Sequence, residues 1–103
     1  MILIYITCKD EQEAVKITKH LLRKKLIACN NFFPIKSMYW WKGKIEKDNE
    51  IVLLAKTTED KYDSVVKEVK KIHSYDIPCI MKLKADCNKE YDNWIKEETF
   101  KNR

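Results

Sequence analysis

Six side chains of this 103-residue chain could bind a soft metal ion, because thiolate sulfur and imidazole nitrogen are the ligands that zinc and copper(I) prefer. They are Cys8, Cys29, Cys79, Cys87, His20 and His73. No two cysteines form a Cys-x-x-Cys pair, which argues against a zinc ribbon and a thioredoxin-type redox site. In a reducing compartment the cysteines are expected to be free thiols.

The fold decides which of these side chains can meet. Residues 2–8 form an apolar run of strand length, and Asp10 with Glu13 resembles a capping box that opens a helix to about Lys25. A second strand runs from Leu26 to Trp41, with a bulge or bend expected at Pro34. A third strand ends near Thr57, and the turn between these two strands lies around Lys42-Gly43 or within residues 46–49.

The second half of the chain repeats this alternation. Thr57 or Thr58 is expected to cap a helix whose apolar residues recur at helical spacing as far as Ile72. A fourth strand covers residues 79–85, and a final helix follows a cap at Asp86 or Asn88. The predicted order is therefore β-α-β-β-α-β plus a terminal helix, in a single domain over residues 1–103.

Two right-handed β-α-β crossovers joined by a hairpin predict a ferredoxin-like α+β sandwich with strand order 4-1-3-2 and both main helices on one face. This topology brings Cys8, Cys79 and His73 to one edge of the sheet, and leaves Cys29 at the opposite end. The three could form a soft-metal site. Alternatively, Cys8 and Cys79 are small buried residues on neighbouring strands, and His73 caps a helix end.

Neighbouring residues of a strand point to opposite faces, so Trp40 and Trp41 place one indole on each face of the hairpin. A second copy of the chain is the simplest cover for the face that the core does not bury. We therefore expect Tyr39, Trp40 and Trp41 at an interface. Stacking of these rings on a ligand or a nucleotide base is the alternative.

Five segments of the chain resemble the CutA family of divalent-cation tolerance proteins. They are Leu26-Ile-Ala-Cys-Asn30, the run from Ser37 to Glu46 with Tyr-Trp-Trp-Lys-Gly-Lys-Ile-Glu, Leu54-Ala-Lys-Thr57, His73-Ser-Tyr-Asp-Ile-Pro78 and Tyr91-Asp-Asn-Trp94. The resemblance covers nearly the whole chain. It implies a cytoplasmic homotrimer similar in shape to the PII signalling proteins, with an extended hairpin that reaches neighbouring subunits.

The resemblance also implies metal sites near subunit interfaces, which fall on Cys29 and His73 with Tyr75 and Asp76 nearby. Two positions depart from the family's pattern. Cys79 stands where the family often has a glutamate, and this thiol favours copper(I) or zinc over harder ions. Ser74 replaces a proline. The predicted metal ligands are therefore Cys29, His73 and Cys79.

Composition limits the other functions. The net charge of +5 permits contact with nucleic acid, but the lysines are scattered along the sequence, so nucleic acid is not an expected partner. No glycine-rich phosphate loop and no local nucleophile–base motif indicates an enzyme. The N-terminus does not resemble a signal peptide and no apolar run could span a membrane, so we expect a soluble cytoplasmic protein. The high content of charged residues favours a thermophilic source.

The leading hypothesis is a homotrimer that binds copper or another divalent or soft metal ion and acts in metal tolerance. The alternative is a PII-like signalling or adaptor module that binds a small molecule or a partner protein at clefts between subunits.

Overall fold

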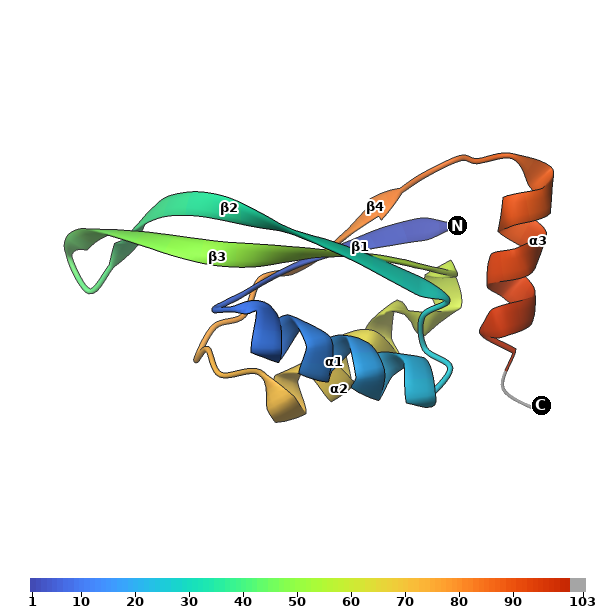
Figure 1. Cartoon of the computed structure of the whole chain (residues 1–103), viewed down its shortest axis with the longest axis horizontal. Coiled ribbons are helices and arrows are strands. Elements are labelled where there is room, and N and C mark those ends of the chain that lie inside the picture. Colours follow the sequence, from blue (N-terminus) through green and yellow to red (C-terminus); the bar gives the residue numbers. More distant parts are fainter. Residues whose placement is uncertain (101–103) are drawn as a thin grey trace.

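The chain folds in the predicted order, and the computed structural model describes residues 1–100 (Figure 1). The strands are β1 (Ile2–Cys8), β2 (Cys29–Trp41), β3 (Lys44–Thr57) and β4 (Ile80–Lys84). The helices are α1 (Glu11–Arg23), α2 (Tyr62–Ile72) and α3 (Lys89–Glu98), and a short 3-10 turn, Glu59–Lys61, leads into α2.

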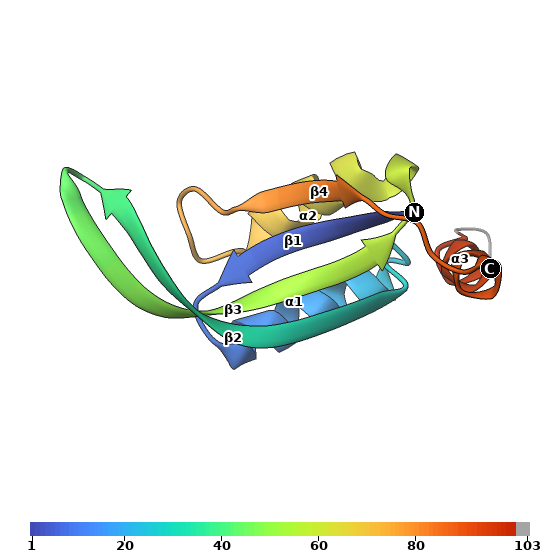
Figure 2. The same cartoon turned by 90° about the horizontal axis from the view of Figure 1, so that it is seen from above.

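The four strands form one antiparallel sheet in the order β2-β3-β1-β4, which confirms the ferredoxin-like α+β prediction. Helices α1 and α2 lie against one face of the sheet (Figure 1). Seen from above, the other face carries no helix, and α3 lies beyond the end of the sheet (Figure 2). We call this second face the open face.

The core lies between the sheet and the two helices. Every second residue of β1 points into it, as the alternation of a strand requires. The buried core residues from β1, α1 and α2 are Ile2, Ile4, Ile6, Cys8, Ala14, Ile17, Leu21, Val65 and Val69. Each fully buried aliphatic side chain contributes about 1.5–3 kcal/mol, so this layer accounts for much of the stability of a single chain.

Helix α1 is defined by signals at both ends. The side chain of Asp10 accepts a hydrogen bond from the Glu13 amide at 2.9 Å, which confirms the predicted cap. The Glu13 carboxylate, however, accepts from the Lys9 amide instead of that of Asp10. The helix ends at Arg23 because Lys25 adopts a left-handed conformation with φ of 60°, and the amide of Leu26 then donates to the carbonyl of Leu21.

The β2–β3 hairpin extends past the helices and turns at Lys42-Gly43 (Figures 1 and 2). Both turn residues have positive φ, 49° and 79°, as a type I′ turn requires. The register stays constant from Cys29↔Lys56 to Trp41↔Lys44. Of the bulge or bend expected at Pro34, the bulge is therefore wrong. Proline is tolerated because β2 is an edge strand, where a missing N–H breaks no pairing.

Of the caps predicted for the other two helices, Thr58 and Asn88 make no side-chain bond to the backbone. Thr57 is the last residue of β3, and its hydroxyl donates to the Leu26 carbonyl. Thr58 precedes the 3-10 turn, and its hydroxyl bonds the Asp60 carboxylate at 2.5 Å. Asn88 precedes α3 and donates to the Glu90 carboxylate at 3.3 Å. Both side chains therefore bond carboxylates of the first turn in place of its amide groups.

Candidate functional site

His73 directly follows α2, and its side chain is completely buried. The Nε2 atom lies 2.8 Å from the Thr7 carbonyl, and the Nδ1 atom lies 3.0 Å from the Tyr75 amide nitrogen. An amide can only donate and a carbonyl can only accept, so the ring carries its hydrogen on Nε2 and is neutral. Both ring nitrogens are thus engaged with the backbone, and one bond must open before the ring can bind a metal ion.

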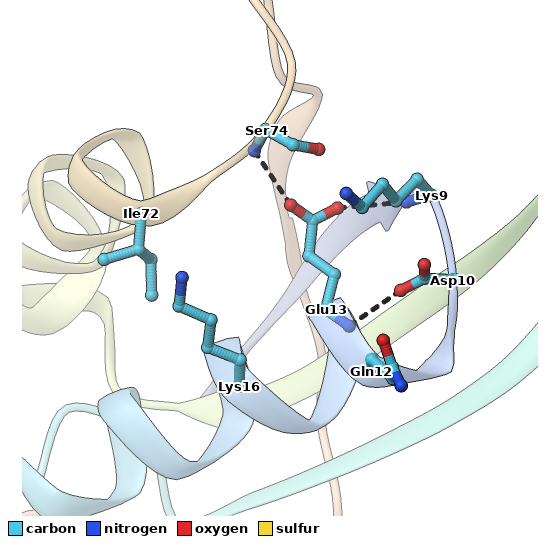
Figure 3. A pocket seen from close by; sticks show the side chains of 7 residues that line it. All are labelled: Lys9, Asp10, Gln12, Glu13, Lys16, Ile72 and Ser74. Carbon is cyan, nitrogen blue, oxygen red and sulfur yellow. Dashed lines mark hydrogen bonds between the residues drawn. The ribbon is translucent and has the colours of Figure 1, made fainter.

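Glu13 holds the loop that His73 begins. One carboxylate oxygen accepts from the Lys9 amide at 3.0 Å, and the other accepts from the Ser74 amide at 2.8 Å (Figure 3). Burial of Glu13 raises its pKa, but the hydrogen bonds from Lys9 and Ser74 outweigh burial and hold the pKa below 4.5. The carboxylate is therefore charged at neutral pH and joins the start of α1 to the loop after α2.

A second buried carboxylate completes this polar network on β3. The Tyr75 hydroxyl donates to Glu50 at 2.6 Å, and Glu50 is only 9% exposed. Burial and this bond both raise the pKa of Tyr75, so the phenol remains protonated. The loop after α2 is thus fixed at three points, by Glu13, by the Thr7 carbonyl and by Glu50.

The cysteines at this edge do not share one face of the sheet. Cys8 lies in the core, and burial together with Glu13 and Asp10 raises its pKa to about 12. Cys79 directly precedes β4, and alternation along the strand places it on the side of Met81 and Leu83, which is the open face. Burial and Glu50 raise the pKa of the Cys79 thiol.

Within residues 1–100 no group of three or more His, Cys, Asp or Glu side chains could hold a metal ion. The topology does bring His73 and the two cysteines to one edge of the sheet, as expected. Their side chains do not form a metal site within a single copy, because Cys8 is enclosed by the core and the ring of His73 is held by the backbone. Cys8 fits the alternative prediction of a small buried residue.

Cys29 begins β2 at the opposite end of the sheet, beside Lys56 of β3. The Lys56 ammonium lies 3.9 Å from the Cys29 sulfur and 5.9 Å from the ring centroid of Tyr91 on α3. Burial raises the pKa of Tyr91, and the two neighbouring thiols Cys29 and Cys87 raise it further. A single copy therefore cannot bring Cys29 to His73 and Cys79, and a site with all three needs more than one copy.

The open face and the hairpin expose large apolar side chains. On the open face, Phe33, Met81 and Leu83 are 43%, 48% and 46% exposed. On the hairpin, Trp40 is 73% exposed and Trp41 is 37% exposed, and the two indoles lie on opposite faces as predicted. An apolar surface of this kind marks an interaction site.

A shallow pocket of about 240 Å³ lies between the start of α1 and the loop after α2 (Figure 3). Its lining residues are Lys9, Asp10, Gln12, Glu13, Lys16, Ile72 and Ser74. Both oxygens of Glu13 and the Oδ1 atom of Asp10 already accept hydrogen bonds from backbone amides. The pocket therefore offers mainly lysine ammonium groups and polar side chains to a ligand.

The structure so far defines a ferredoxin-like α+β protein with an open apolar sheet face and two partly accessible thiols at opposite ends of the sheet. The family model of the CutA1 divalent ion tolerance protein matches residues 2–98. The chain belongs to this family, as the sequence motifs predicted.

Individual relatives match over almost their full length. The chain is 41% identical over 102 residues to the divalent-cation tolerance protein CutA of Pyrococcus horikoshii, covering 98% of this chain and 100% of the relative. It is 46% identical over 101 residues to the divalent-cation tolerance protein CutA of Thermotoga maritima, and the match covers 97% of this chain and 100% of the relative. The structure of CutA from Archaeoglobus fulgidus, which is described as periplasmic, superposes on this chain with a TM-score of 0.94. The two sequences are 46% identical, and the superposition covers 97% of this chain and 100% of the A. fulgidus chain.

The sequence analysis missed the two buried carboxylates of the polar network. Glu13 was assigned only to the helix cap, although its second oxygen holds the Ser74 amide across 61 residues of sequence. Glu50 was not singled out at all. A charged residue directly before the apolar run Ile51–Ala55 was the available signal, since a charge at such a position needs a partner when it is buried.

Proposed function

We propose that the chain acts in metal tolerance as a homotrimer that binds soft or divalent metal ions and performs no catalysis. Membership of a family named for divalent-cation tolerance supports the proposed binding of metal ions. The single structural observation that carries the proposal is the position of two partly accessible thiols, Cys29 and Cys79, at opposite ends of an uncovered apolar sheet face. Other copies that cover this face would bring thiols of different copies together.

The donor set fits copper(I) or zinc better than a harder ion, because its accessible members are sulfur atoms. Cys29 and Cys79 would hold the ion as thiolates, and the Lys56 ammonium lies 3.9 Å from the Cys29 sulfur. His73 joins the site only if its bond to Thr7 or to Tyr75 opens. We place the protein in the cytoplasm, where the four free cysteines would stay reduced.

Light scattering of the purified chain tests the assembly. A homotrimer has about three times the 12.4 kDa mass of the chain, about 37 kDa. A folded species that stays at 12.4 kDa at micromolar concentration would reject the trimer.

Calorimetric titration with zinc, and with copper(I) under reducing conditions, tests the ligands. Cys29→Ser and Cys79→Ser should each weaken binding at least tenfold. Cys87→Ser is the matched control, because it makes the same chemical change at an exposed thiol that is not a proposed ligand. If all three variants bind like the parent, these ligands are wrong. Native mass spectrometry that detects a copurified small molecule in place of metal would favour the signalling alternative.

A further inference from the structure

The two helices that cover the core gather positive charge on their outer surface. Among the residues of α1 with its cap Lys24 and of α2, seven lysines and arginines are exposed but only two carboxylates, Glu11 and Asp63. The exposed cations are Lys16, Lys19, Arg23, Lys24, Lys67, Lys70 and Lys71. Glu13 and Glu68 belong to the same helices, but their side chains are only 5% and 12% exposed. We call this surface the basic helix face.

This asymmetry accounts for most of the net charge. The residues of α1, Lys24, Lys25 and α2 contain eight cationic and four anionic side chains, a net charge of +4 out of +5 for the whole chain. In the sequence these lysines are scattered, which argued against nucleic acid. The fold brings two segments about 50 residues apart side by side, as the bond between His20 and Glu68 shows, and so concentrates the charge.

Most of these cations are not neutralised by neighbours. The Glu68 carboxylate forms ion pairs with two of these cations, because it lies 3.9 Å from the Lys24 ammonium and 3.1 Å from the Lys71 ammonium. Within the described residues no ion pair involves Lys16, Lys19, Arg23, Lys67 or Lys70. On α1, Lys16, Lys19 and Arg23 follow one another at spacings of three and four residues, which places them along one stripe of the helix.

The chemistry of this face selects one kind of partner. Leu22, at 39%, is the single large apolar side chain of α1 and α2 that is exposed, whereas the large exposed aromatics lie on the hairpin, the sheet and α3. Membrane insertion and a protein interface core both need apolar or aromatic anchors. A surface of exposed cations without such anchors suits a phosphate backbone, which is bound through charge alone.

We propose that the basic helix face binds duplex nucleic acid through its phosphates, without reading the bases. The face is on the opposite side of the sheet from the open face, so this contact is compatible with coverage of the open face by other copies (Figure 1). It is also independent of the metal-binding proposal, because none of its residues is a proposed metal ligand.

Fluorescence anisotropy with a labelled 20-base-pair duplex tests the proposal. At 50 mM salt each lost phosphate contact costs about 15-fold in affinity, from a slope of about −0.9 in log K against log salt for each contact. Lys19→Gln with Lys67→Gln removes two contacts, so it should weaken binding about 200-fold and reduce the salt slope by about 2. Lys84→Gln with Lys89→Gln is the matched control, because it removes the same charge from exposed positions outside the basic helix face, at the end of β4 and the start of α3.

The control pair should bind within about twofold of the parent chain. Circular dichroism checks that both double variants remain folded, so that a loss of binding is not a loss of structure. The proposal is overturned if the two pairs weaken binding equally, if binding does not depend on salt, or if no binding occurs at 50 mM salt. Displacement of the duplex by an equal charge concentration of polyglutamate would instead assign the face to an acidic protein.

Discussion

Replacement of Glu13 tests the polar network at its centre. Glu13→Ala removes both acceptors and leaves the amides of Lys9 and Ser74 without their protein partner in a part-buried position. An unsatisfied buried donor costs about 1–3 kcal/mol, and two part-buried donors that water can partly reach should together cost about 2–3 kcal/mol. Glu13→Gln keeps one carbonyl oxygen and can satisfy one amide, and should cost about half as much.

Guanidinium unfolding at equal protein concentrations measures both variants, since association would otherwise shift the midpoints. Amide hydrogen exchange gives a local readout, with faster exchange at Ser74 and Lys9 in the alanine variant. The pKa of Glu13 is lowered in the folded chain, so the parent should lose this stabilisation as the pH falls below 4.5, and Glu13→Gln should not. The reasoning fails if Glu13→Ala costs less than 1 kcal/mol, or if alanine and glutamine are equivalent.

Three further predictions concern single residues. Lys25→Gly should raise the free energy of unfolding by about 1 kcal/mol, because glycine accepts the φ of 60° without strain; an unchanged unfolding midpoint would contradict this. Hydrogen bonds from His20 and Lys71 lower the pKa of Glu68 to about 2, so NMR titration should find this carboxyl charged down to about that pH, and His20→Gln should move its pKa toward 4.5. A thiol reagent should modify exposed Cys87 quickly and Cys8 only on unfolding, as peptide mass spectrometry can check. Equal rates at the two thiols would show that the core is open.

Much of the fold could be predicted because local signals agree with the topology. The apolar run of β1 and the helical period of α2 predict their elements directly, and Gly43 marks one of the two turn positions that the sequence allowed. Handedness rules then leave few arrangements of four strands and two helices. The Pro34 bulge was wrong because the prediction treated proline as a break. An edge strand tolerates proline, and β2 can be recognised as an edge strand only once the strand order of the sheet is known.

Less of the candidate site than of the fold could be predicted from the sequence. The topology correctly brought His73 to the end of β1, but it could not show that both ring nitrogens bond the backbone. The partner of each buried carboxylate is also distant in sequence, since Glu13 bonds Ser74 and Glu50 bonds Tyr75. Such contacts depend on side-chain direction and loop geometry, which no local pattern encodes.

Pro34 has a consequence for how chains can aggregate. The outer edge of β2 is 13 residues long and presents unpaired backbone groups, which is a template for adding a strand from another molecule. Proline fits at an outward-facing position because it has no N–H to give. A foreign strand laid along this edge would therefore miss one hydrogen bond near its middle. This gap disfavours the continuous edge-to-edge stacking that produces amyloid-like fibrils, while shorter pairings on either side of Pro34 remain available.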